Sequence, residues 1–499
     1  MPSQPCLAEF EHLQRLADAM VETASALGSG WIAPWRKRAD KLRETLDLES
    51  RDGERALDAL AFDLRRVWLQ QSHAHSTGYL MSPPQGQAKH LPDGKRIGYP
   101  YDRWIKPAHL TARLDVLNPA PPGWHGQSLM FANGMSALTT FLQVYRAFAD
   151  RWLQRPKGHL SLHWFGGYFE IVKAMQLICD DHLHGRKHAN QHNFRTAVEK
   201  GIADLVLIEP VAAELTLDMF DLEAFIAAWK RRKTKRPCVV LVDSTLSGDT
   251  FPLAHLAEAL SPNPPALIVE VRSGLKLDQQ GLELSNAGMM SLWAPDTEEA
   301  HARLKLITHS TRVARTTLGG GLSQNEYAAL TVPFFLDRAQ LHSHADAVFE
   351  HNKLFARRLA ETLQPGSGLF ADVFHPSLSA ARGKLWAKAP YVNVSYRPDD
   401  DSARAFLRAI LEFEAEARKL TFVPGSSFGF RGHRFEMGFA RGLKHSTLRI
   451  AMGARAGPSV EGVIELFEDL AAFEDFPALR AAYPEIAKRH PIDRTDEET

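Results

Sequence analysis

The chain contains 499 residues, and its 59 lysines and arginines balance its 59 aspartates and glutamates to a formal net charge of zero. This balance gives no sign of a protein that binds nucleic acid, an acidic membrane or a polyanionic substrate. A chain of this length is too long to fold around one small hydrophobic core, so we expect more than one domain. Hydrophobic and charged residues make up 44% and 24% of the chain, as in ordinary globular proteins.

Cysteine use and the N-terminal segment bear on the compartment. Cys6, Cys179 and Cys238 are odd in number and widely spaced, which excludes a disulfide framework and a cysteine-based zinc site and fits a reducing environment. Glu9 and Glu11 interrupt the apolar residues near the N-terminus, so this segment predicts an amphipathic helix and not a signal peptide. No apolar run is long enough for a transmembrane helix. We therefore expect a cytoplasmic protein with no membrane partner.

The chain begins with helical patterns. Apolar residues recur at helical spacing through residues 1–75, which predicts two or three helices. Residues 76–127 are rich in glycine and proline and predict an extended connection. We place a helical N-terminal extension at residues 1–98.

From residue 128 onward, short apolar runs alternate with helical patterns. Strands are predicted over 128–131, 160–165, 204–209, 238–243 and 266–271, and helices over 134–152, 169–179 and 222–232. Most of these runs are apolar throughout, which is typical of strands buried on both faces of a parallel sheet. The alternation predicts a mostly parallel, doubly wound α/β domain, which we place at residues 99–330. A histidine-rich run over 182–192 is expected to be a solvated loop, and we predict no metal site.

The last part of the chain predicts a smaller α/β domain. A long helix is expected over 325–363, followed by a strand at 391–396, a helix at 401–418 and a strand at 447–452. With its linking helix, this domain is placed at residues 331–499. The charged tail after Pro484 is expected to pack poorly.

Lys276 is the most informative single residue. It follows the apolar strand 266–271 and stands close to Ser273 and Gly274. A lysine buried in such a place has a lowered pKa and is suited to form a Schiff base. The alternative is an ordinary solvated lysine.

Other polar residues end neighbouring predicted strands. Asn133, with Gly134 and Met135 after it, follows the first strand, and Asp243 ends the strand before that of Lys276. Ligands of doubly wound sheets bind at the carboxyl ends of the strands. We therefore expect these residues to form one site with Ser273 and Lys276.

Short motifs with matching chemistry continue along the chain. Tyr101 and Arg103 stand one residue apart, and the planar fork of an arginine suits phosphate. Gly134 allows the backbone to approach a ligand where a helix opens, and helix N–H groups bind anions. Phe165 precedes a Gly-Gly pair and Tyr168.

In this order the motifs resemble the fold-type I pyridoxal-phosphate (PLP) enzymes of cysteine and methionine metabolism. The nearest branch holds cystathionine γ-synthases, cystathionine lyases and methionine γ-lyase. The resemblance covers roughly residues 99–455 and includes Ser427 and Arg449 near the C-terminus. It implies a large PLP-binding α/β domain, a smaller C-terminal α/β domain, and PLP as the cofactor.

The resemblance also implies roles for individual residues. Lys276 would form the Schiff base, Asp243 would face the pyridinium nitrogen, and Tyr168 would assist catalysis. Cofactor-binding roles fall on the residues of the shared motifs: Tyr101, Arg103, Gly134, Met135, Phe165, Asp243, Ser273 and Lys276. Arg449 would clamp the substrate α-carboxylate, with Ser427 beside it. In the family, the Tyr and Arg of the first motif reach the PLP of a neighbouring subunit, which implies a homodimer or homotetramer with shared active sites.

Departures from the family pattern bear on the reaction. Phe165 stands where the family has a ring-stacking tyrosine, and Leu275 replaces a phosphate-contacting threonine. The family's Gly-His-x-Asp after the lysine is replaced by the segment Gln280–Glu283. The family's Asn after its Glu-x-Pro segment is also absent, although Glu209 and Pro210 are present.

The resulting hypothesis is γ-elimination or γ-replacement on an L-amino acid that carries a leaving group at its γ-carbon. A phenylalanine cannot donate a proton, so a γ-group that leaves readily as an anion, such as chloride, is favoured. Removing it from a chlorinated unsaturated amino acid would give a terminal alkyne, as a divergent branch of the family does. An O-acylhomoserine or cystathionine-type C–S lyase or synthase, an aminotransferase, and a non-catalytic protein with the same fold remain as alternatives.

Overall fold

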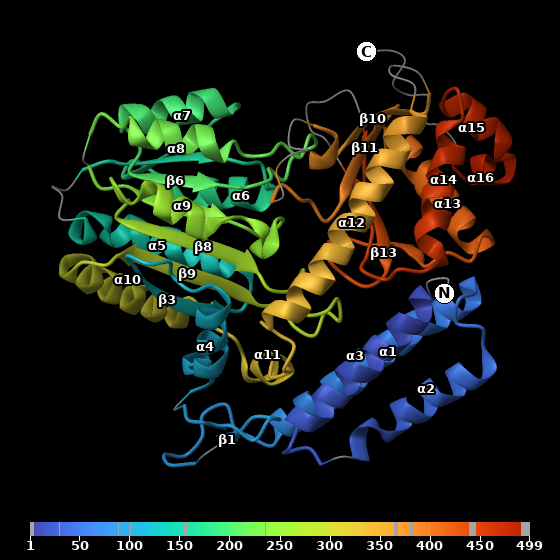
Figure 1. The fold of residues 1–499 in the computed structure, drawn as a ribbon, viewed down its shortest axis with the longest axis horizontal. Coiled ribbons are helices and arrows are strands. Elements are labelled where there is room, and N and C mark those ends of the chain that lie inside the picture. Colours follow the sequence, from blue (N-terminus) through green and yellow to red (C-terminus); the bar gives the residue numbers. More distant parts are fainter. Residues whose placement is uncertain are drawn as a thin grey trace.

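The computed structural model describes residues 4–28, 30–87, 89–99, 101–153, 158–234, 236–363, 368–379, 384, 386–398, 400–438 and 446–490. Figure 1 shows a large sheet between helices on one side of the molecule and a smaller sheet with its helices on the other. The N-terminal helices lie below the smaller sheet. No helix in the described ranges is long and apolar enough to cross a membrane.

The large sheet confirms the prediction of a mostly parallel, doubly wound architecture. Its strand order is β3 (Trp124–Phe131), β9 (Gly288–Pro295), β8 (Leu267–Ser273), β7 (Val239–Asp243), β6 (Leu205–Ile208), β4 (Leu160–Phe165) and β5 (Leu183–Lys187). Strand β9 is antiparallel to both neighbours, and the other pairs are parallel. The carboxyl ends of the parallel strands therefore meet along one edge.

Apolar helices cover both faces of this sheet. One face packs against α5 (Gly134–Trp152), α6 (Phe169–Ile178) and α10 (Glu298–Thr317). The other face packs against α7 (Gln191–Lys200), α8 (Leu222–Lys230) and α9 (Leu253–Leu260). Burial on both faces explains why the strand sequences are apolar throughout.

Part of the histidine-rich run forms a strand, so the predicted loop is wrong there. Residues Leu183–Lys187 make the edge strand β5, paired in parallel with β4. His188 is buried, and its ring stacks on that of His163 with the centroids 5.0 Å apart. An edge strand pairs with a neighbour along one side only and leaves its other side open to solvent. Polar residues are compatible with that position, so they did not prevent strand formation.

The smaller sheet has the order β10 (Phe370–Phe374), β11 (Val392–Tyr396), β14 (Ser446–Ala451), β13 (His433–Gly438) and β12 (Phe422–Pro424). Strands β12 and β13 are parallel, and the other neighbours are antiparallel. Its core is shared with α12 (Arg338–Thr362), α13 (Asp401–Ala417), α14 (Pro458–Ala471) and α15 (Phe476–Ala482). Helix α16 (Pro484–Arg489) contains no buried residue, and the residues after 490 lie outside the described ranges.

Two sequence predictions were wrong in detail. The helix expected over 325–363 is divided into α11 (Gln324–Ala329) and α12. Pro333 lies in the interruption, where it lacks a backbone donor and disfavours helix in the preceding residue. The segment expected to be extended over 76–127 contains α4 (Ala108–Leu117), besides the short strands β1 (Lys89–His90) and β2 (Arg96–Ile97).

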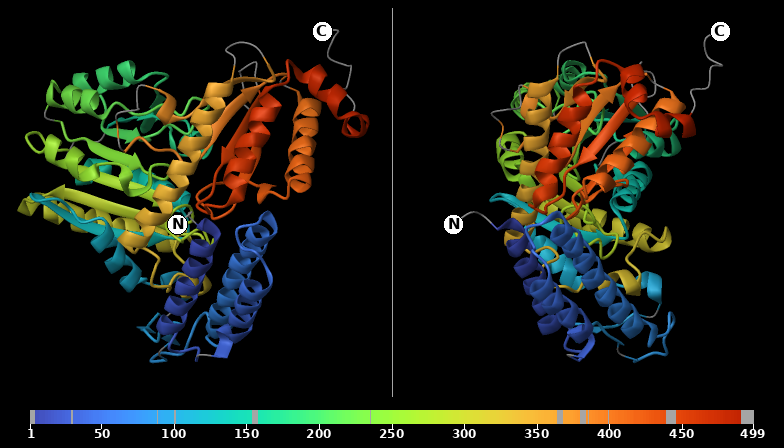
Figure 2. Two further views of the ribbon diagram at one scale, coloured as in Figure 1. Left: turned by 45° about the vertical axis from the view of Figure 1, so that its right-hand side comes forward. Right: turned by 90° about the vertical axis from the view of Figure 1, so that its right-hand side faces the viewer.

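The N-terminal helices are α1 (Pro5–Thr23), α2 (Ala33–Thr45) and α3 (Arg51–Thr77). Figure 2 shows them side by side in both views. Their apolar faces share a core with α11 and with Leu282 and Leu284, which follow Lys276 in the chain. Trp68 of α3 donates a hydrogen bond to the carbonyl of Ala329, at 2.9 Å. The N-terminal helices therefore pack directly on the segment beyond Lys276.

A buried ion pair joins the N-terminal helices to the smaller sheet region. Glu9 of α1 receives hydrogen bonds from Arg431, with Nε 2.6 Å from Oε1, and both side chains are 6% exposed. Burial opposes ionisation of Glu9, but the charge and hydrogen bonds of Arg431, with help from Arg455, lower its pKa to about 2. Arg455 also pairs with Asp58 of α3, at 2.7 Å.

Replacing Glu9 by glutamine is expected to lower the free energy of unfolding by about 3–5 kcal/mol, because it leaves Arg431 buried without its charge partner. The Glu9 pKa is depressed, so the stabilisation is present above about pH 4.5 and is lost as the pH falls towards 2. Denaturant unfolding at pH 7 and at lower pH measures both effects. Glu11→Gln, which alters an exposed residue of the same helix, is the control, and equal stability of the two variants would contradict the prediction.

Candidate active site

Thr245 connects two of the residues expected in the site. Its backbone N–H donates to Oδ1 of Asp243 at 3.0 Å, and its hydroxyl accepts from the backbone N–H of Ser273 at 3.1 Å. Asp243 ends β7 and Ser273 ends β8, and these strands are neighbours. The sheet therefore brings both residues to its carboxyl edge, as the sequence predicts.

Gly134 brings the start of α5 against the same edge. A Cβ at this position would lie 3.2 Å from Cα, Cβ and the backbone N of Ser273, so only glycine permits the observed approach. Asn133 caps the helix by accepting from the N–H of Ser136 at 2.7 Å. The first N–H groups of a helix have no partner within it, and they favour an anion. The side chain of Met135 packs on the core beneath the helix.

Asp243 is a carboxyl group in an apolar setting. Burial raises its pKa, and the hydrogen bonds from Thr245 offset part of that rise. A carboxyl in this setting ionises more easily when a cationic group comes to lie against it. The position therefore suits an acid that holds a protonated nitrogen.

Lys276 follows β8 in a short loop and is partly buried. Its amine donates a hydrogen bond to the hydroxyl of Ser427 and lies 5.3 Å from the centre of the Phe428 ring. Burial lowers its pKa, which the charges of Glu283 and Glu170 partly restore. A lysine in this setting holds a larger neutral fraction at pH 7 than an exposed one and is a better nucleophile and base.

The loop that carries Lys276 is held by buried polar contacts. Gln279 is fully buried, and its amide donates to the carbonyls of Gly274 at 2.8 Å and Ser285 at 2.6 Å. Arg272 and Asp278 form a buried ion pair at 3.0 Å. These contacts fix both ends of the loop, so Lys276 is presented at one position.

Ser427 reaches Lys276 from the smaller sheet region in a strained conformation. Its φ is +77°, in the left-handed region that non-glycine residues rarely adopt. Such strain persists where the surrounding structure imposes it, and it is common at functional sites. The contact closes the site between the large and smaller sheets.

Tyr168 is the aromatic residue of the candidate site that the sequence singled out. Its hydroxyl donates to Oε2 of Glu170 at 2.7 Å. Burial and Glu170 raise its pKa far above the usual value, Asp243 raises it further, and Arg449 opposes the shift. The hydroxyl is therefore within electrostatic reach of both Asp243 and Arg449.

Glu209 shapes the turn that presents Tyr168. Its buried carboxylate accepts the backbone N–H groups of Gly167 at 3.2 Å, Tyr168 at 3.0 Å and Ala213 at 2.8 Å. Burial raises the pKa of Glu209 to about 7 against these hydrogen bonds. Gly166 has a φ of +134°, and a Cβ there would lie 2.3 Å from Glu209.

Arg449 lies on β14, and protein groups bind only part of its guanidinium. Its Nη1 donates to Glu436 Oε2 at 3.0 Å, and its guanidinium lies 4.5 Å from the centre of the Tyr391 ring. Nε is buried and has no hydrogen-bond partner in the described part of the chain. A planar carboxylate would satisfy this donor, although it must compete with Glu436.

Other expected site residues lie elsewhere. The ring of Phe165 packs in the core beside Phe220 and Phe194, at centroid distances of 5.8 and 6.5 Å, and does not join Tyr168. Tyr101 and Arg103 lie in an exposed turn, where the guanidinium lies 5.0 Å from the tyrosine ring centre. Strand alternation explains the position of Phe165, because the last residue of β4 points to the face of the sheet that α7, α8 and α9 cover.

Several residues of the candidate site were not singled out from sequence. Glu170 is two positions after Tyr168, and Glu436 lies opposite Arg449 in the pairing of β13 with β14. Glu209 was noted only as part of a motif. The sequence could have revealed it, because Glu209 stands directly after an apolar strand and before a proline, where an exposed surface charge is not expected.

Solved structures of similar shape come from one group of enzymes. A methionine γ-lyase from Micromonospora echinospora is 19% identical, with a TM-score of 0.51, covering 75% of this chain and 88% of its own. A cystathionine γ-synthase from Xanthomonas oryzae pv. oryzae, in complex with cystathionine, is 17% identical, with a TM-score of 0.51, covering 76% and 89%. A cystathionine γ-lyase from yeast is 15% identical, with a TM-score of 0.54, covering 79% and 92%.

The chain has the fold of these γ-lyases and γ-synthases. No protein-family model and no curated protein matches its sequence. At these identities the likeness concerns the γ-lyase fold alone. About nine-tenths of each solved chain is matched, so nearly the whole γ-lyase fold is present here.

Proposed function

We propose that this protein is a PLP-dependent enzyme that eliminates or replaces a γ-substituent of an L-amino acid. The observation that carries the proposal is the arrangement of Lys276, Asp243 and Ser273 at the ends of β7 and β8. It occurs in a chain with the γ-lyase fold. These residue types at these strand ends supply an amine, a carboxylate and a phosphate-binding hydroxyl.

The residues present fit PLP. The start of α5, drawn against Ser273 by Gly134, offers N–H groups to a phosphate. Asp243, whose pKa burial raises, gains a cationic partner if it faces a protonated ring nitrogen. When bound, PLP supplies an aldehyde that joins an amine and a ring that withdraws electrons.

Lys276 and Arg449 would handle the substrate. The lowered pKa of Lys276 leaves a larger fraction of neutral amine to accept the Cα proton at neutral pH. Arg449 would bind the α-carboxylate through Nε and Nη1, displacing Glu436. Ser427, which accepts the hydrogen bond of Lys276, would keep the amine oriented towards Cα.

The proton supply to the leaving group bears on the substrate. Phe165 is in the core, and Tyr168 has a raised pKa and donates a hydrogen bond to Glu170. A hydroxyl held in this way is a weak acid towards a departing group. We therefore favour a γ-group that leaves as a stable anion, such as the chloride of a chlorinated unsaturated amino acid, whose loss would give a terminal alkyne.

A C–S lyase or synthase is the second candidate. Tyr168 stands within electrostatic reach of Asp243 and Arg449, where a general acid would be needed if a thiolate left. Rotation of its hydroxyl away from Glu170 would be required before it could donate.

Purified protein incubated with PLP is expected to show a visible absorbance band that Lys276→Ala abolishes, because the amine that binds the aldehyde is missing. Borohydride treatment followed by peptide mass spectrometry should place the reduced adduct on Lys276. Lys173→Ala, which alters an exposed lysine of α6, should retain both signals. An adduct on another lysine would refute the assignment.

A substrate panel tests the reaction. A 4-chloro-4-alkenyl amino acid is expected to release chloride with the wild type, and Tyr168→Phe should change this rate little because chloride needs no protonation. With cystathionine, the same variant should lose roughly a hundredfold in rate if Tyr168 is the general acid. Chloride at the level of a Lys276→Ala control would exclude dehydrochlorination, and sulfur products alone would favour the second candidate.

We also propose a dimer or tetramer whose sites are shared. Tyr101 and Arg103 are exposed on the isolated chain, as residues that contact a second subunit would be. Leu80, Met81 and Trp104 nearby expose 61%, 62% and 54% of their surface. The backbone N–H of Asp102 joins these segments by donating to the carbonyl of Met81 at 2.8 Å. Such an apolar patch is typical of an interface.

Mixing of inactive subunits tests the sharing. If Arg103 serves the partner's site, an equal mixture of Arg103→Ala and Lys276→Ala subunits should regain about a quarter of wild-type activity, because random exchange leaves one complete site in half of the dimers. The activity measured is that on the best substrate of the panel. A mixture no more active than either variant alone would contradict shared sites.

A further inference from the structure

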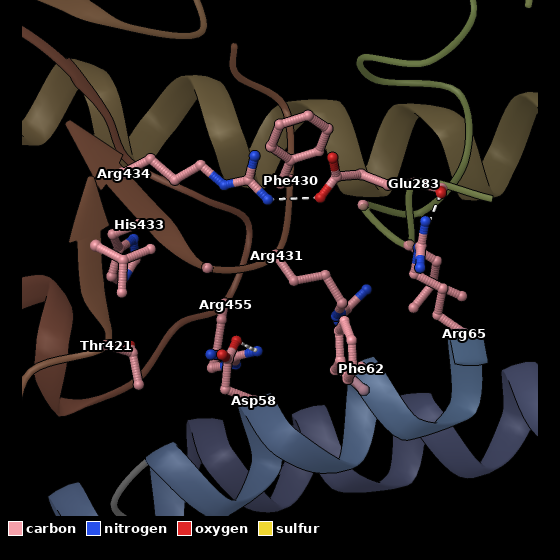
Figure 3. Close-up of a pocket in the computed structure, with 15 residues that line it drawn as sticks. Asp58, Phe62, Arg65, Glu283, Thr421, Phe430, Arg431, His433, Arg434 and Arg455 are labelled. Carbon is pink, nitrogen blue, oxygen red and sulfur yellow. Dashed lines mark hydrogen bonds and ion pairs between the residues drawn. The ribbon is translucent and has the colours of Figure 1, made fainter. Parts of the chain in front are cut away.

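A cavity lies beside the segment that follows Lys276. Its volume is about 140 Å³, and it is enclosed by α3, the loop residues Gly281–Glu283, and the strands and turns of the smaller sheet. Figure 3 shows Asp58, Phe62 and Arg65 of α3 on one side of it and Arg434 on the other. None of the proposed substrate and cofactor residues lines this cavity.

The lining carries an excess of positive charge. Four arginines face two carboxylates, which gives a formal charge of +2: Arg65, Arg431, Arg434 and Arg455 against Asp58 and Glu283. Arg434 pairs with Glu283 at 2.5 Å, and Arg455 pairs with Asp58 at 2.7 Å. Arg431 uses Glu9, which lies behind the lining, so one positive charge remains after every carboxylate in contact is counted.

Two fully buried side chains of the lining have donors without protein partners. Arg455 is 0% exposed, and its Nη1 has no hydrogen-bond partner within the residues that the structure describes. The same holds for Nε2 of His433, which is also 0% exposed. A buried donor that finds no acceptor costs free energy, so an acceptor at this position would be stabilising.

The tautomer of His433 makes Nε2 a donor. Its Nδ1 lies 2.9 Å from the backbone N–H of Gly453 and must accept that hydrogen bond. Burial and the nearby charges of His351 and Arg455 lower its pKa well below the usual value, so the ring is neutral. A neutral imidazole that accepts at Nδ1 carries its hydrogen at Nε2.

We propose that this cavity binds a phosphate-sized oxyanion, either free or as part of a small metabolite. Arg455 and His433 are 0% exposed, so their free Nη1 and Nε2 donors lie just behind the cavity wall, and the anion would reach them by entering between the lining side chains. Arg65, which is half-buried, supplies a further charge. A cavity of this size holds several waters, which is room for one phosphate or sulfate but not for a nucleotide. Arginine is well suited to such a ligand, because its fork matches the spacing of the oxygens.

The position of the cavity connects it with the loop of Lys276. Gly281 and Glu283 line it, and Arg431 donates to the carbonyl of Gln280 at 2.9 Å. An oxyanion that binds Arg434 competes with Glu283 for that guanidinium. Binding would therefore shift Glu283, whose charge acts on Lys276.

Calorimetric titration of the full chain, saturated with PLP, tests the site. Inorganic phosphate is expected to bind at one site per chain at constant ionic strength, whereas added chloride gives no saturable heat. Glycerol 3-phosphate forms a second arm: tighter binding than phosphate would identify a metabolite's phosphate group as the ligand, and weaker binding would identify the free anion. Absence of saturable binding in both arms overturns the proposal.

Variants locate the binding. Arg455→Met and Arg65→Met are each expected to weaken phosphate binding about tenfold or more, since each removes a charged donor. Arg55→Met is the control, because Arg55 lies on the same helix, pairs with Glu416 at the surface and does not line the cavity. If Arg455→Met fails to fold, Arg65→Met decides. Unchanged affinity in Arg65→Met, or equal weakening in Arg55→Met, overturns the proposal.

Discussion

The position of Lys276 depends on the buried polar contacts of the loop that carries it. Gln279 donates to the carbonyls of Gly274 and Ser285, which lie on opposite sides of the lysine. The Arg272–Asp278 pair holds the start of the same loop, and burial raises the pKa of Asp278 to about 6 even beside that arginine. Water would weaken such contacts, so the loop keeps its shape only while the surrounding core excludes water.

The N-terminal helices provide part of that exclusion. They pack on Leu282 and Leu284, and Glu9 holds Arg431, which in turn donates to the carbonyl of Gln280. The same arginine therefore connects α1, the Lys276 loop and the smaller sheet region. This arrangement explains why the extension belongs to the structure of the site although it contributes none of the proposed reacting groups. It also makes movement of the smaller sheet relative to α1 costly, because that movement would separate a buried ion pair.

Much of the large sheet and its site could be predicted because the signals are local. Apolar strands buried on both faces, and polar residues directly after them, are visible in the order of residues alone, and α5 and β4 have the predicted bounds. Phe165 shows the limit of this reasoning. Its motif position suggests a ring in the site, but the alternation of side chains along β4 turns it into the core beside Phe220.

The residues missed from sequence act through contacts between distant segments. Glu436 meets Arg449 only because β13 and β14 pair in one register, and Glu283 meets Arg434 across 151 positions of the chain. Gly134 was expected to face a ligand, whereas its tightest structural constraint is the backbone of Ser273. A single sequence does not encode such distances in its local patterns.

If Arg449 binds the substrate's α-carboxylate as we propose, its pairing with Glu436 affects the choice of substrate. An arginine already bound to one carboxylate exchanges it for another at little net gain, so the α-carboxylate alone contributes less binding than a free arginine would provide. Glu436 also accepts a hydrogen bond from Ser426 at 2.7 Å, which holds it in place when Arg449 turns to the substrate. The remaining affinity must come from the rest of the amino acid, near Lys276, where Glu170, Glu283 and Arg434 exert their charges. A substrate whose side chain carries a polar or charged group near these residues would therefore bind more tightly than one with a purely aliphatic side chain. That group would lie in the γ-region of the substrate, from which the substituent leaves.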